Sequence, residues 1–291
     1  MKLLFITDKE FPPEPRIYNE AYSLVKSGVE VTVLSLTTSS SVSREEVLDG
    51  IRIIRIKCSK SIFKKLWALV FTFPFFRWYL TPKLTPYLAG LEYDIIHLHN
   101  IVLAPIIFKH NRHNKPIVLD IHENLPEIIK EYPHYKTFLG QMLIFPSIWK
   151  KNEKYFIKRA NLCIVVAQEA KEYYVKHFKT NATNFLVLPN TVLKSFYKTP
   201  TIQNTITEKY QDSVVLLYLG DTGLRRGLPI VISILPDLIK LIPKIKLVIA
   251  GSSRTDNLLK TQAQKLGVEK YIDFLGWIDN KLFPTYIQLS R

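Results

Sequence analysis

The sequence predicts an α/β protein with two doubly wound domains, the second of them incomplete. Short apolar segments rich in β-branched residues alternate with segments of helix length through most of the 291 residues. Several of the short segments are apolar almost throughout, as are strands of a parallel sheet that is covered on both faces. The alternation stops in a polar stretch at 194–213 and then starts again, which predicts a linker between the domains.

The first domain, residues 1–193, contains seven segments with the composition of strands. Each is rich in Val, Ile and Leu and is followed by polar, proline or glycine residues. They are 2–7, 29–36, 50–57, 94–99, 116–122, 162–167 and 184–190. The clearest helix between them spans 15–28, where Gly28 can end it. Its apolar residues recur at helical spacing on one face: Ile17, Ala21, Leu24 and Val25.

The second domain, residues 214–291, repeats the pattern on a smaller scale. Its predicted strands are 214–220, 245–251 and 271–276. The segment 226–242 is predicted to be helical, with Pro229 near its first turn. Three strands are few for an independent open sheet, so this domain is expected to be incomplete.

The composition restricts the partners and the compartment. A net charge of +15 predicts an anionic partner, which includes nucleic acid, anionic lipid and phosphate-bearing substrates. The sequence has no zinc-finger spacing and no RNA-recognition signature, so nucleic acid is not expected. Cys58 and Cys163 both lie in apolar segments, which predicts reduced, buried thiols and a cytoplasmic protein.

The segment 60–83 favours a membrane surface among the anionic partners. Its apolar run at 66–76 is shorter than the roughly 20 residues that a spanning helix needs. Basic residues flank the run, and Trp67 and Trp78 lie near its ends, as in a helix that lies in a lipid interface. The protein is therefore expected to be cytoplasmic and peripheral on the inner membrane face. The alternative is a buried helix with a solvated basic end.

Ligands of open parallel sheets bind at the carboxyl ends of the strands, so candidate site residues are expected there. The first such loop is 7–16, which contains three prolines and ends at Arg16, close to the start of a helix. An anion at this place would meet both the helix dipole and a guanidinium group. The alternative is an ordinary surface loop with a solvated arginine.

A second loop follows the strand at 116–122. Asp120, His122 and Glu123 bring three titratable groups to the end of this strand. A histidine in such a position can donate a hydrogen bond to a substrate hydroxyl or diphosphate, and its pKa is easily tuned. The alternative is a histidine that is satisfied by the local backbone.

His97 and His99 project from the same face of the strand at 94–99. Two histidines alone do not close a metal site, and no third ligand stands at a telling spacing, so no metal is predicted. A structural role is expected for His97. His99 and Asn100, at the tip of the strand, are candidate residues of a substrate cleft.

The loop 218–229 follows a strand and opens a helix. Its four candidate residues for binding a phosphate or a diphosphate are Gly220, Arg225, Arg226 and Gly227. Glycine allows the backbone to approach a ligand, and two arginines before a helix N-terminus favour an anion. The loop is neither G-x-G-x-x-G nor a P-loop, which leaves the motif class open.

With these segments in order, the chain resembles the family 4 glycosyltransferases of the GT-B fold, which are retaining enzymes with two Rossmann-like domains. The resemblance is carried by seven segments in the family's order: "YDIIHLHN", "PIVLDIHENLPE", "LCIVVAQEAKEYY", "VLPNTV", "YLGDTGLRRGL", "KLVIAG" and "FLGWIDNKLFPTYI". It implies transfer of a sugar from a nucleotide-sugar to a hydroxyl of a glycan or lipid-linked acceptor. It implies no protein nucleophile, cofactor or metal.

The resemblance also implies roles for single residues. His122 matches the histidine that faces the reaction centre, Arg16 matches the arginine of the first loop–helix turn, and Asn190 lies at the step into the interdomain hinge. The segment 220–227 matches the segment that holds the donor diphosphate. A basic residue usually follows the first glycine of that segment, whereas Asp221 stands here.

In the family, a helix with two glutamates spaced E-x7-E follows the segment that 271–289 resembles. This sequence ends before that helix, so the resemblance implies a truncated or split enzyme with impaired transfer. One alternative is a non-catalytic basic module that binds an anionic membrane or a separate C-terminal half. A nucleotide-sugar epimerase is a weaker alternative, because such enzymes place several carboxylates in the cleft and only Asp120 and Glu123 are available.

Overall fold

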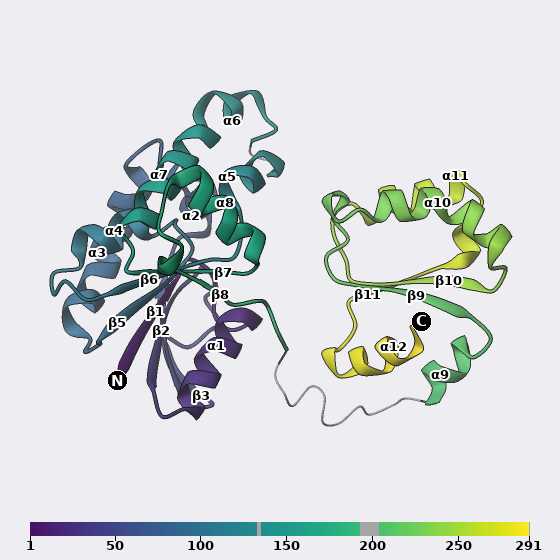
Figure 1. Ribbon diagram of the computed structural model, residues 1–291, viewed down its shortest axis with the longest axis horizontal. Helices are drawn as coiled ribbons and strands as arrows, with labels where there is room; N and C mark the ends of the chain where they lie inside the picture. Colours follow the sequence, from purple (N-terminus) through teal and green to yellow (C-terminus); the bar gives the residue numbers. More distant parts are fainter. Residues whose placement is uncertain (133–134, 193–203, 291) are drawn as a thin grey trace. The chain divides into compact units, whose positions relative to one another are not determined.

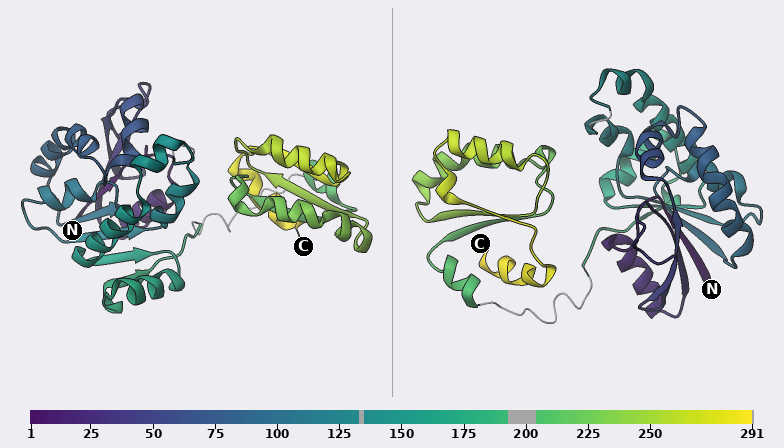
Figure 2. Two further views of the ribbon diagram at one scale, coloured as in Figure 1. Left: turned by 90° about the horizontal axis from the view of Figure 1, so that it is seen from above. Right: turned by 180° about the vertical axis from the view of Figure 1, so that it is seen from behind.

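The protein forms two compact α/β units, Met1–Thr191 and Val192–Arg291 (Figure 1). The computed structural model describes residues 1–132, 135–192 and 204–290. The predicted fold class is confirmed, because each unit is a sheet of mainly parallel strands with helices on both faces (Figures 1 and 2). The first unit ends two residues before the predicted domain end at residue 193.

The first unit is built on an eight-stranded sheet in the order β3-β4-β2-β1-β5-β6-β7-β8. The strands are β1 (Lys2–Thr7), β2 (Glu30–Thr37), β3 (Glu45–Leu48), β4 (Ile51–Lys57), β5 (Ile95–His99), β6 (Ile117–Ile121), β7 (Leu162–Val165) and β8 (Phe185–Val187). Every neighbouring pair is parallel except β3 with β4. The sequence did not predict β3, because two of its four residues are glutamates.

The two faces of this sheet are covered by different helices, because successive side chains of a strand point to opposite faces. On one face Phe5 packs with Ile17 and Ala21 of α1 (Pro15–Lys26). On the other face Leu4 and Ile6 share the larger core with helices that follow β4. These helices are α2 (Lys60–Leu66), α3 (Phe75–Gly90), α4 (Ala104–His110), α5 (Leu125–Ile128), α7 (Pro146–Arg159) and α8 (Gln168–Phe178). The short helix α6 (Phe138–Leu143) precedes α7.

The segment 60–83 is not one interfacial helix. It forms α2, a 3₁₀ turn and the first half of α3, and Phe76 and Leu80 are fully buried. Trp67 donates its Nε1–H to the Asp8 carboxylate over 2.6 Å. Most of the aromatic block is therefore core, as the alternative for this segment expected. Within the described residues, no helix has the length and apolar character needed to cross a membrane.

The second unit contains a three-stranded parallel sheet in the order β11-β10-β9. Its strands are β9 (Val214–Leu219), β10 (Ile245–Ala250) and β11 (Ile272–Gly276). Helices α10 (Leu228–Leu241) and α11 (Asp256–Lys265) cover one face, with Ile232 and Leu259 in the core. Helices α9 (Asn204–Tyr210) and α12 (Phe283–Leu289) lie on the other face.

The predicted linker at 194–213 is wrong in its second half, because residues 204–210 form α9. Tyr210 of this helix is buried beside Tyr286, and its hydroxyl donates to Asp273 over 2.7 Å. One buried aromatic on a polar helix gives no periodic signal in the sequence. The first half of the predicted linker, 194–203, lies outside the described residues.

Candidate functional site

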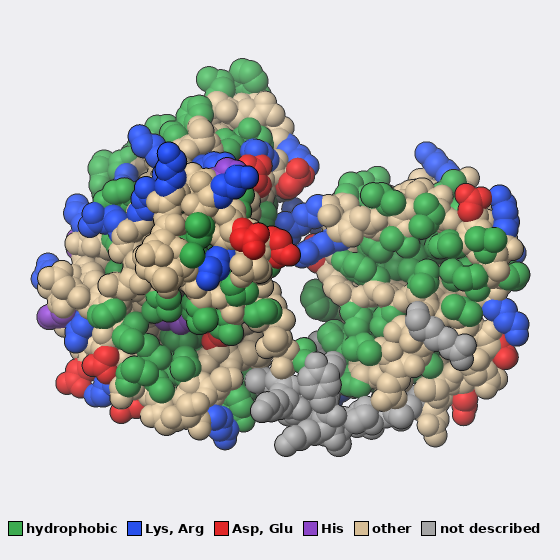
Figure 3. All heavy atoms as spheres, viewed as in Figure 1, with side chains coloured by type: hydrophobic (Ala, Val, Ile, Leu, Met, Phe, Trp, Pro, Cys, Tyr) green, Lys and Arg blue, Asp and Glu red, His purple; other side chains and the backbone are tan. Residues whose placement is uncertain are grey.

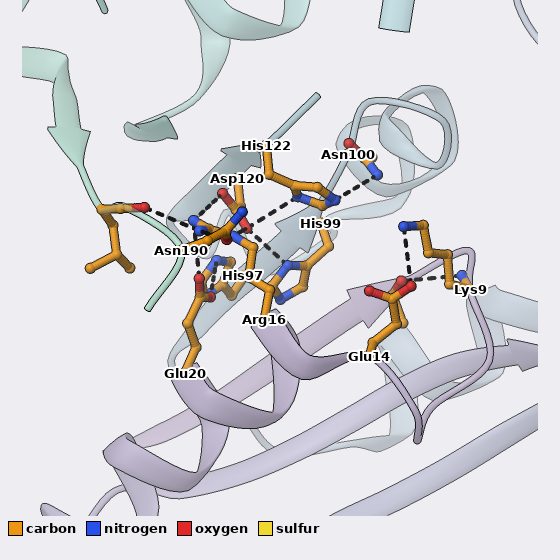
Figure 4. A network of polar contacts seen from close by, with 12 residues as sticks. Lys9, Glu14, Arg16, Glu20, His97, His99, Asn100, Asp120, His122 and Asn190 are labelled. Carbon is orange, nitrogen blue, oxygen red and sulfur yellow. Dashed lines mark hydrogen bonds and ion pairs between the residues drawn. The ribbon is translucent and has the colours of Figure 1, made fainter. Parts of the chain in front are cut away.

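A buried ion pair between Arg16 and Asp120 forms the centre of the polar cluster in the first unit (Figure 4). The guanidinium group donates from Nε and Nη2 to the two carboxylate oxygens over 2.8 and 2.9 Å. The side chains are 8% and 0% exposed. Arg16 lies in the first turn of α1 and Asp120 near the carboxyl end of β6, so the pair joins the helix to the sheet.

The remaining donors of Arg16 also bind the protein. Nη1 donates to the Leu188 carbonyl over 3.1 Å and to Asn190 Oδ1 over 2.8 Å. Nη2 lies 3.1 Å from Glu20 Oε1. The predicted anion site at Arg16 therefore disagrees with the geometry, because an external anion would have to displace protein acceptors. Arg16 instead positions Asp120 and the segment that follows β8, where Asn190 lies.

Asp120 also organises two histidines. His99 Nδ1 lies 3.1 Å and His122 Nδ1 lies 3.5 Å from Asp120 Oδ2. Burial on its own would raise the pKa of Asp120, but the contacts with His122, His99 and Arg16 outweigh it and hold the pKa well below its ordinary value. Asn100 Nδ2 lies 3.4 Å from the other ring nitrogen of His122. Asp120 is thus a carboxylate that orients the ring of His122.

Glu20 and His97 complete the cluster on the α1 face of the sheet. His97 Nε2 lies 3.7 Å from Glu20 Oε2, and the His97 ring stacks on His99 with centroids 4.5 Å apart. Burial, together with the charge of Asp120, raises the pKa of Glu20 to about 8. Burial lowers the pKa of His97 well below its ordinary value, so its imidazole is neutral near pH 7. His97 packs against Phe5, which agrees with its expected structural role.

Four residues of this cluster could together hold a metal ion. Glu20, His97, His99 and Asp120 offer ligand atoms that all lie within 4.8 Å of one another. The sequence could not show this set, because α1 and β6 supply the third and fourth members through the fold. However, Arg16 already binds the carboxyl groups of Asp120 and Glu20, and its charge balances that of Asp120. A divalent cation here would add uncompensated buried charge unless Glu20 ionised or Arg16 moved away.

The structure thus brings together most of the site residues predicted in the first unit. His99, Asn100, Asp120, His122, Arg16 and Asn190 form one connected network, whereas Glu123 is not part of it. Sequence reasoning missed Glu20, although it lies one helical turn after Arg16 on the same face. It also missed Asp8, a buried carboxyl at the end of β1 whose pKa burial raises.

In the second unit, the loop between β9 and α10 carries the predicted diphosphate residues. Arg225 and Arg226 lie in a 3₁₀ turn, and Gly227, with φ of 83°, caps the N-terminus of α10. Both arginines are exposed. Among the described residues, the one ion pair that these two arginines make joins Arg226 Nε to Asp221 Oδ2 over 3.6 Å. This weak, half-exposed pair leaves both guanidinium groups accessible to an anion.

The backbone at Gly220, directly after β9, passes close to that at Gly251, directly after β10. A Cβ atom on Gly251, at the end of β10, would lie 1.7 Å from the Gly220 carbonyl oxygen, so the space accepts only glycine. Thr222 is buried and donates its hydroxyl to Asp256. These contacts hold the start of the loop, and the exposed arginines lie between this start and α10.

Two Rossmann-like α/β units in series, with polar groups at the carboxyl ends of the first sheet and a basic loop opening a helix of the second, define a GT-B-type protein. Residues 14–193 match the family model described as Glycosyltransferase Family 4. Residues 201–291 match the model described as Glycosyl transferases group 1. The chain belongs to glycosyltransferase family 4.

Individual relatives are distant. An uncharacterized glycosyltransferase of Methanocaldococcus jannaschii is 24% identical over 213 residues, which are 69% of this chain and 49% of that protein. The chain thus spans about half the length of this relative. Sucrose-phosphate synthase of Thermosynechococcus elongatus superposes with a TM-score of 0.74 at 14% identity, covering 99% of this chain and 73% of that one. Anabaena HepE in complex with UDP and glucose gives 0.64 at 15% identity, covering 100% and 72%.

Replacing Glu20 by glutamine tests whether the cluster buries a protonated carboxyl. The folded protein keeps this proton up to a pKa of about 8, whereas the unfolded chain releases it near 4.5, so stability falls as pH rises between these values. The glutamine variant lacks this loss. We expect the free energy of unfolding of Glu20→Gln, minus that of wild type, to increase by up to about 1.4 kcal/mol per pH unit in this window, measured by urea denaturation.

The matched control is Glu169→Gln, which removes an exposed carboxyl from α8. His97 and His99 are present in all three proteins, so their titration cancels in the differences. The free energy of unfolding of Glu169→Gln, plotted against pH, should run parallel to that of wild type. A Glu20→Gln curve that is also parallel would contradict the protonated, buried state of Glu20.

Proposed function

We propose that the protein transfers a sugar from a nucleotide-sugar donor to a hydroxyl group of an acceptor. Membership of glycosyltransferase family 4 carries this proposal. The second unit would bind the donor diphosphate and the first unit the acceptor. The fold neighbour HepE has been solved with UDP and with UDP-glucose, which makes a UDP-sugar the first donor to test. The proposed scheme uses no cofactor or metal.

The donor side of the proposal depends on charge in the loop before α10. Arg225 and Arg226 are exposed, and the N-terminal end of α10 follows them directly. A diphosphate bound here would meet two guanidinium groups and a helix dipole. The same groups would stabilise the diphosphate as it leaves the sugar, which is where a retaining transfer without a protein nucleophile needs electrostatic help.

The acceptor side of the proposal depends on His122. Its side chain is 12% exposed, whereas Asp120 and His99 beside it are fully buried. The contacts of His122 Nδ1 with Asp120 and of its Nε2 with Asn100 hold the ring at the carboxyl edge of the sheet. We assign His122 to hydrogen bonding with a substrate hydroxyl. His99, Asn100 and Asp120 would act as positioning residues, together with Arg16.

Charge changes in the donor loop should alter UDP affinity in opposite directions. Arg225→Ala and Arg226→Ala each remove a charged donor and should weaken UDP binding by about tenfold or more. Asp221→Asn should strengthen binding, because it removes the acidic partner of Arg226. Isothermal titration with UDP at low ionic strength measures all three.

Lys240→Gln serves as the charge-matched control, because Lys240 lies in the last turn of the same helix and pairs with Asp237. Because salt screens the charge of Lys240 at the far end of α10, the UDP affinity of this variant should stay within twofold of wild type. Equal UDP affinity in wild type and both arginine variants would refute the assignment of the donor loop.

A membrane contact is a second candidate function, and exposed aromatic side chains near the start of α3 favour it. Phe75 and Trp78 are 51% and 66% exposed, and their rings pack edge to face with centroids 5.7 Å apart. The exposed lysines Lys60, Lys64 and Lys65 lie on the neighbouring helix α2. We propose that this edge rests on an anionic membrane at the inner face, which would suit a lipid-linked acceptor.

Co-sedimentation with vesicles tests the membrane contact. Phe75→Ala/Trp78→Ala should reduce binding to vesicles with 30% anionic lipid several-fold, because it removes the apolar anchors. The matched control is Phe138→Ala/Met142→Ala on α6, where other apolar side chains are exposed (Figure 3). Loss of binding in the control alone, or no binding by wild type, would contradict the proposed surface.

A further inference from the structure

A cavity of about 620 Å³ lies at the carboxyl ends of β2 and β4 in the first unit. Thr37, the last residue of β2, and Lys57, the last residue of β4, line it, and Lys83 and Tyr87 of α3 form another wall. None of these residues belongs to the network around Asp120. The position is nevertheless on the same edge of the sheet, which is where α/β folds bind ligands.

The lining of this cavity is strongly basic. Arg44, Arg55, Lys57 and Lys83 contribute to it, and no carboxylate does within the described part of the chain. Arg55 is 4% exposed and already neutralised, because it pairs with Glu46 and donates to the Phe11 and Ser43 carbonyls. The other three cations have no carboxylate within ion-pair distance among the described residues.

Two of these three cations are held at the wall by aromatic residues. Arg44 Nη2 donates to the Tyr87 hydroxyl over 2.8 Å, and Lys83 Nζ lies 5.2 Å from the centre of the Tyr79 ring. Neither contact cancels a charge. Three uncompensated cations around one cavity repel each other, and a bound oxyanion would remove that repulsion while accepting charge-assisted hydrogen bonds.

The shape of the cavity indicates more than a single phosphate. Its volume is within the range of pockets that hold small organic ligands. Pro86, Ile56 and the Tyr87 ring give it an apolar side next to the cations, and Ser39 and Ser40 add hydroxyls. A phosphorylated sugar has this combination of an anionic end, an apolar ring face and hydroxyl groups.

We propose that this cavity binds the phosphate or diphosphate group of the acceptor. The role of the ligand as acceptor rests on the proposed function, whereas binding of the oxyanion does not. The oxyanion could come from a soluble sugar phosphate or from a lipid-linked one, and both have the same chemistry at the cavity. The site would make the enzyme selective for anionic acceptors, with Lys57, Lys83 and Arg44 as the determinants.

The experiment uses inorganic pyrophosphate as the probe in the full chain carrying Arg225→Ala/Arg226→Ala. These substitutions remove the anion-binding groups of the donor loop, so that pyrophosphate bound there does not contribute to the signal. In this background, Lys57→Gln/Lys83→Gln should weaken pyrophosphate binding at least tenfold, measured by isothermal titration. Arg44→Gln provides a second, independent variant with the same expected direction. The control Lys151→Gln/Lys158→Gln removes two exposed charges from α7 and should leave affinity within twofold.

The source of the oxyanion is decided with two further probes. Binding of glucose 1-phosphate that is lost in Lys57→Gln/Lys83→Gln supports a soluble acceptor. Binding only to vesicles with phosphatidic acid, lost in the same variant, supports a lipid-linked one. Equal pyrophosphate affinities of the cavity and α7 variants would overturn the proposal, as would no pyrophosphate binding in the background.

UDP affinity of Lys57→Gln/Lys83→Gln, measured with Arg225 and Arg226 intact, separates this proposal from the proposed function. If Lys57→Gln/Lys83→Gln binds UDP as strongly as wild type, and loses pyrophosphate binding when combined with Arg225→Ala/Arg226→Ala, the cavity is a site separate from the donor loop. If pyrophosphate binding and UDP binding are both unchanged, the cavity is not the oxyanion site, and the assignment of the donor loop is unaffected.

Discussion

The bidentate ion pair between Arg16 and Asp120 is the interaction on which the candidate site depends. Asp120 has no exposure, so its charge is tolerated only because Arg16, His99 and His122 surround it. All the donors of Arg16 are directed at the protein, which ties α1, β6 and the segment after β8 to one guanidinium group. Removal of either charge would leave the other unpaired in the interior, which is more costly than never burying the pair.

Arginine has opposite roles in the two units. In the first unit Arg16 is internal and neutralised, and its function is to hold a carboxylate that in turn orients His122. In the second unit Arg225 and Arg226 are exposed on the loop between β9 and α10, so their charges remain accessible to a ligand. The polar cluster of the first unit is thus a scaffold, whereas the basic loop has the character of a binding surface.

The fold could be predicted from the sequence, because buried parallel strands are apolar throughout and end at polar or glycine residues. The strand β3 and the helix α9 were not predicted, because few of their side chains are buried and their sequences show no hydrophobic periodicity. The positions of polar residues at strand tips, such as His122, were predictable from topology. The role of Arg16 was not, because its partner lies 104 residues away and only the folded chain shows that an apparent anion site is occupied. Glu20 was missed although Arg16 lies one helical turn away, because its burial beside His97 is created only by the fold.

A double-mutant cycle on Arg16 and Asp120 measures how strongly the buried ion pair couples the two residues. The measurement is the free energy of unfolding of the first unit in wild type, Arg16→Met, Asp120→Asn and the double variant. We expect a loss of about 3 kcal/mol or more in each single variant, and a double variant less destabilised than the sum of the two by about 2 kcal/mol or more. Additive losses, or single variants as stable as wild type, would contradict this coupling.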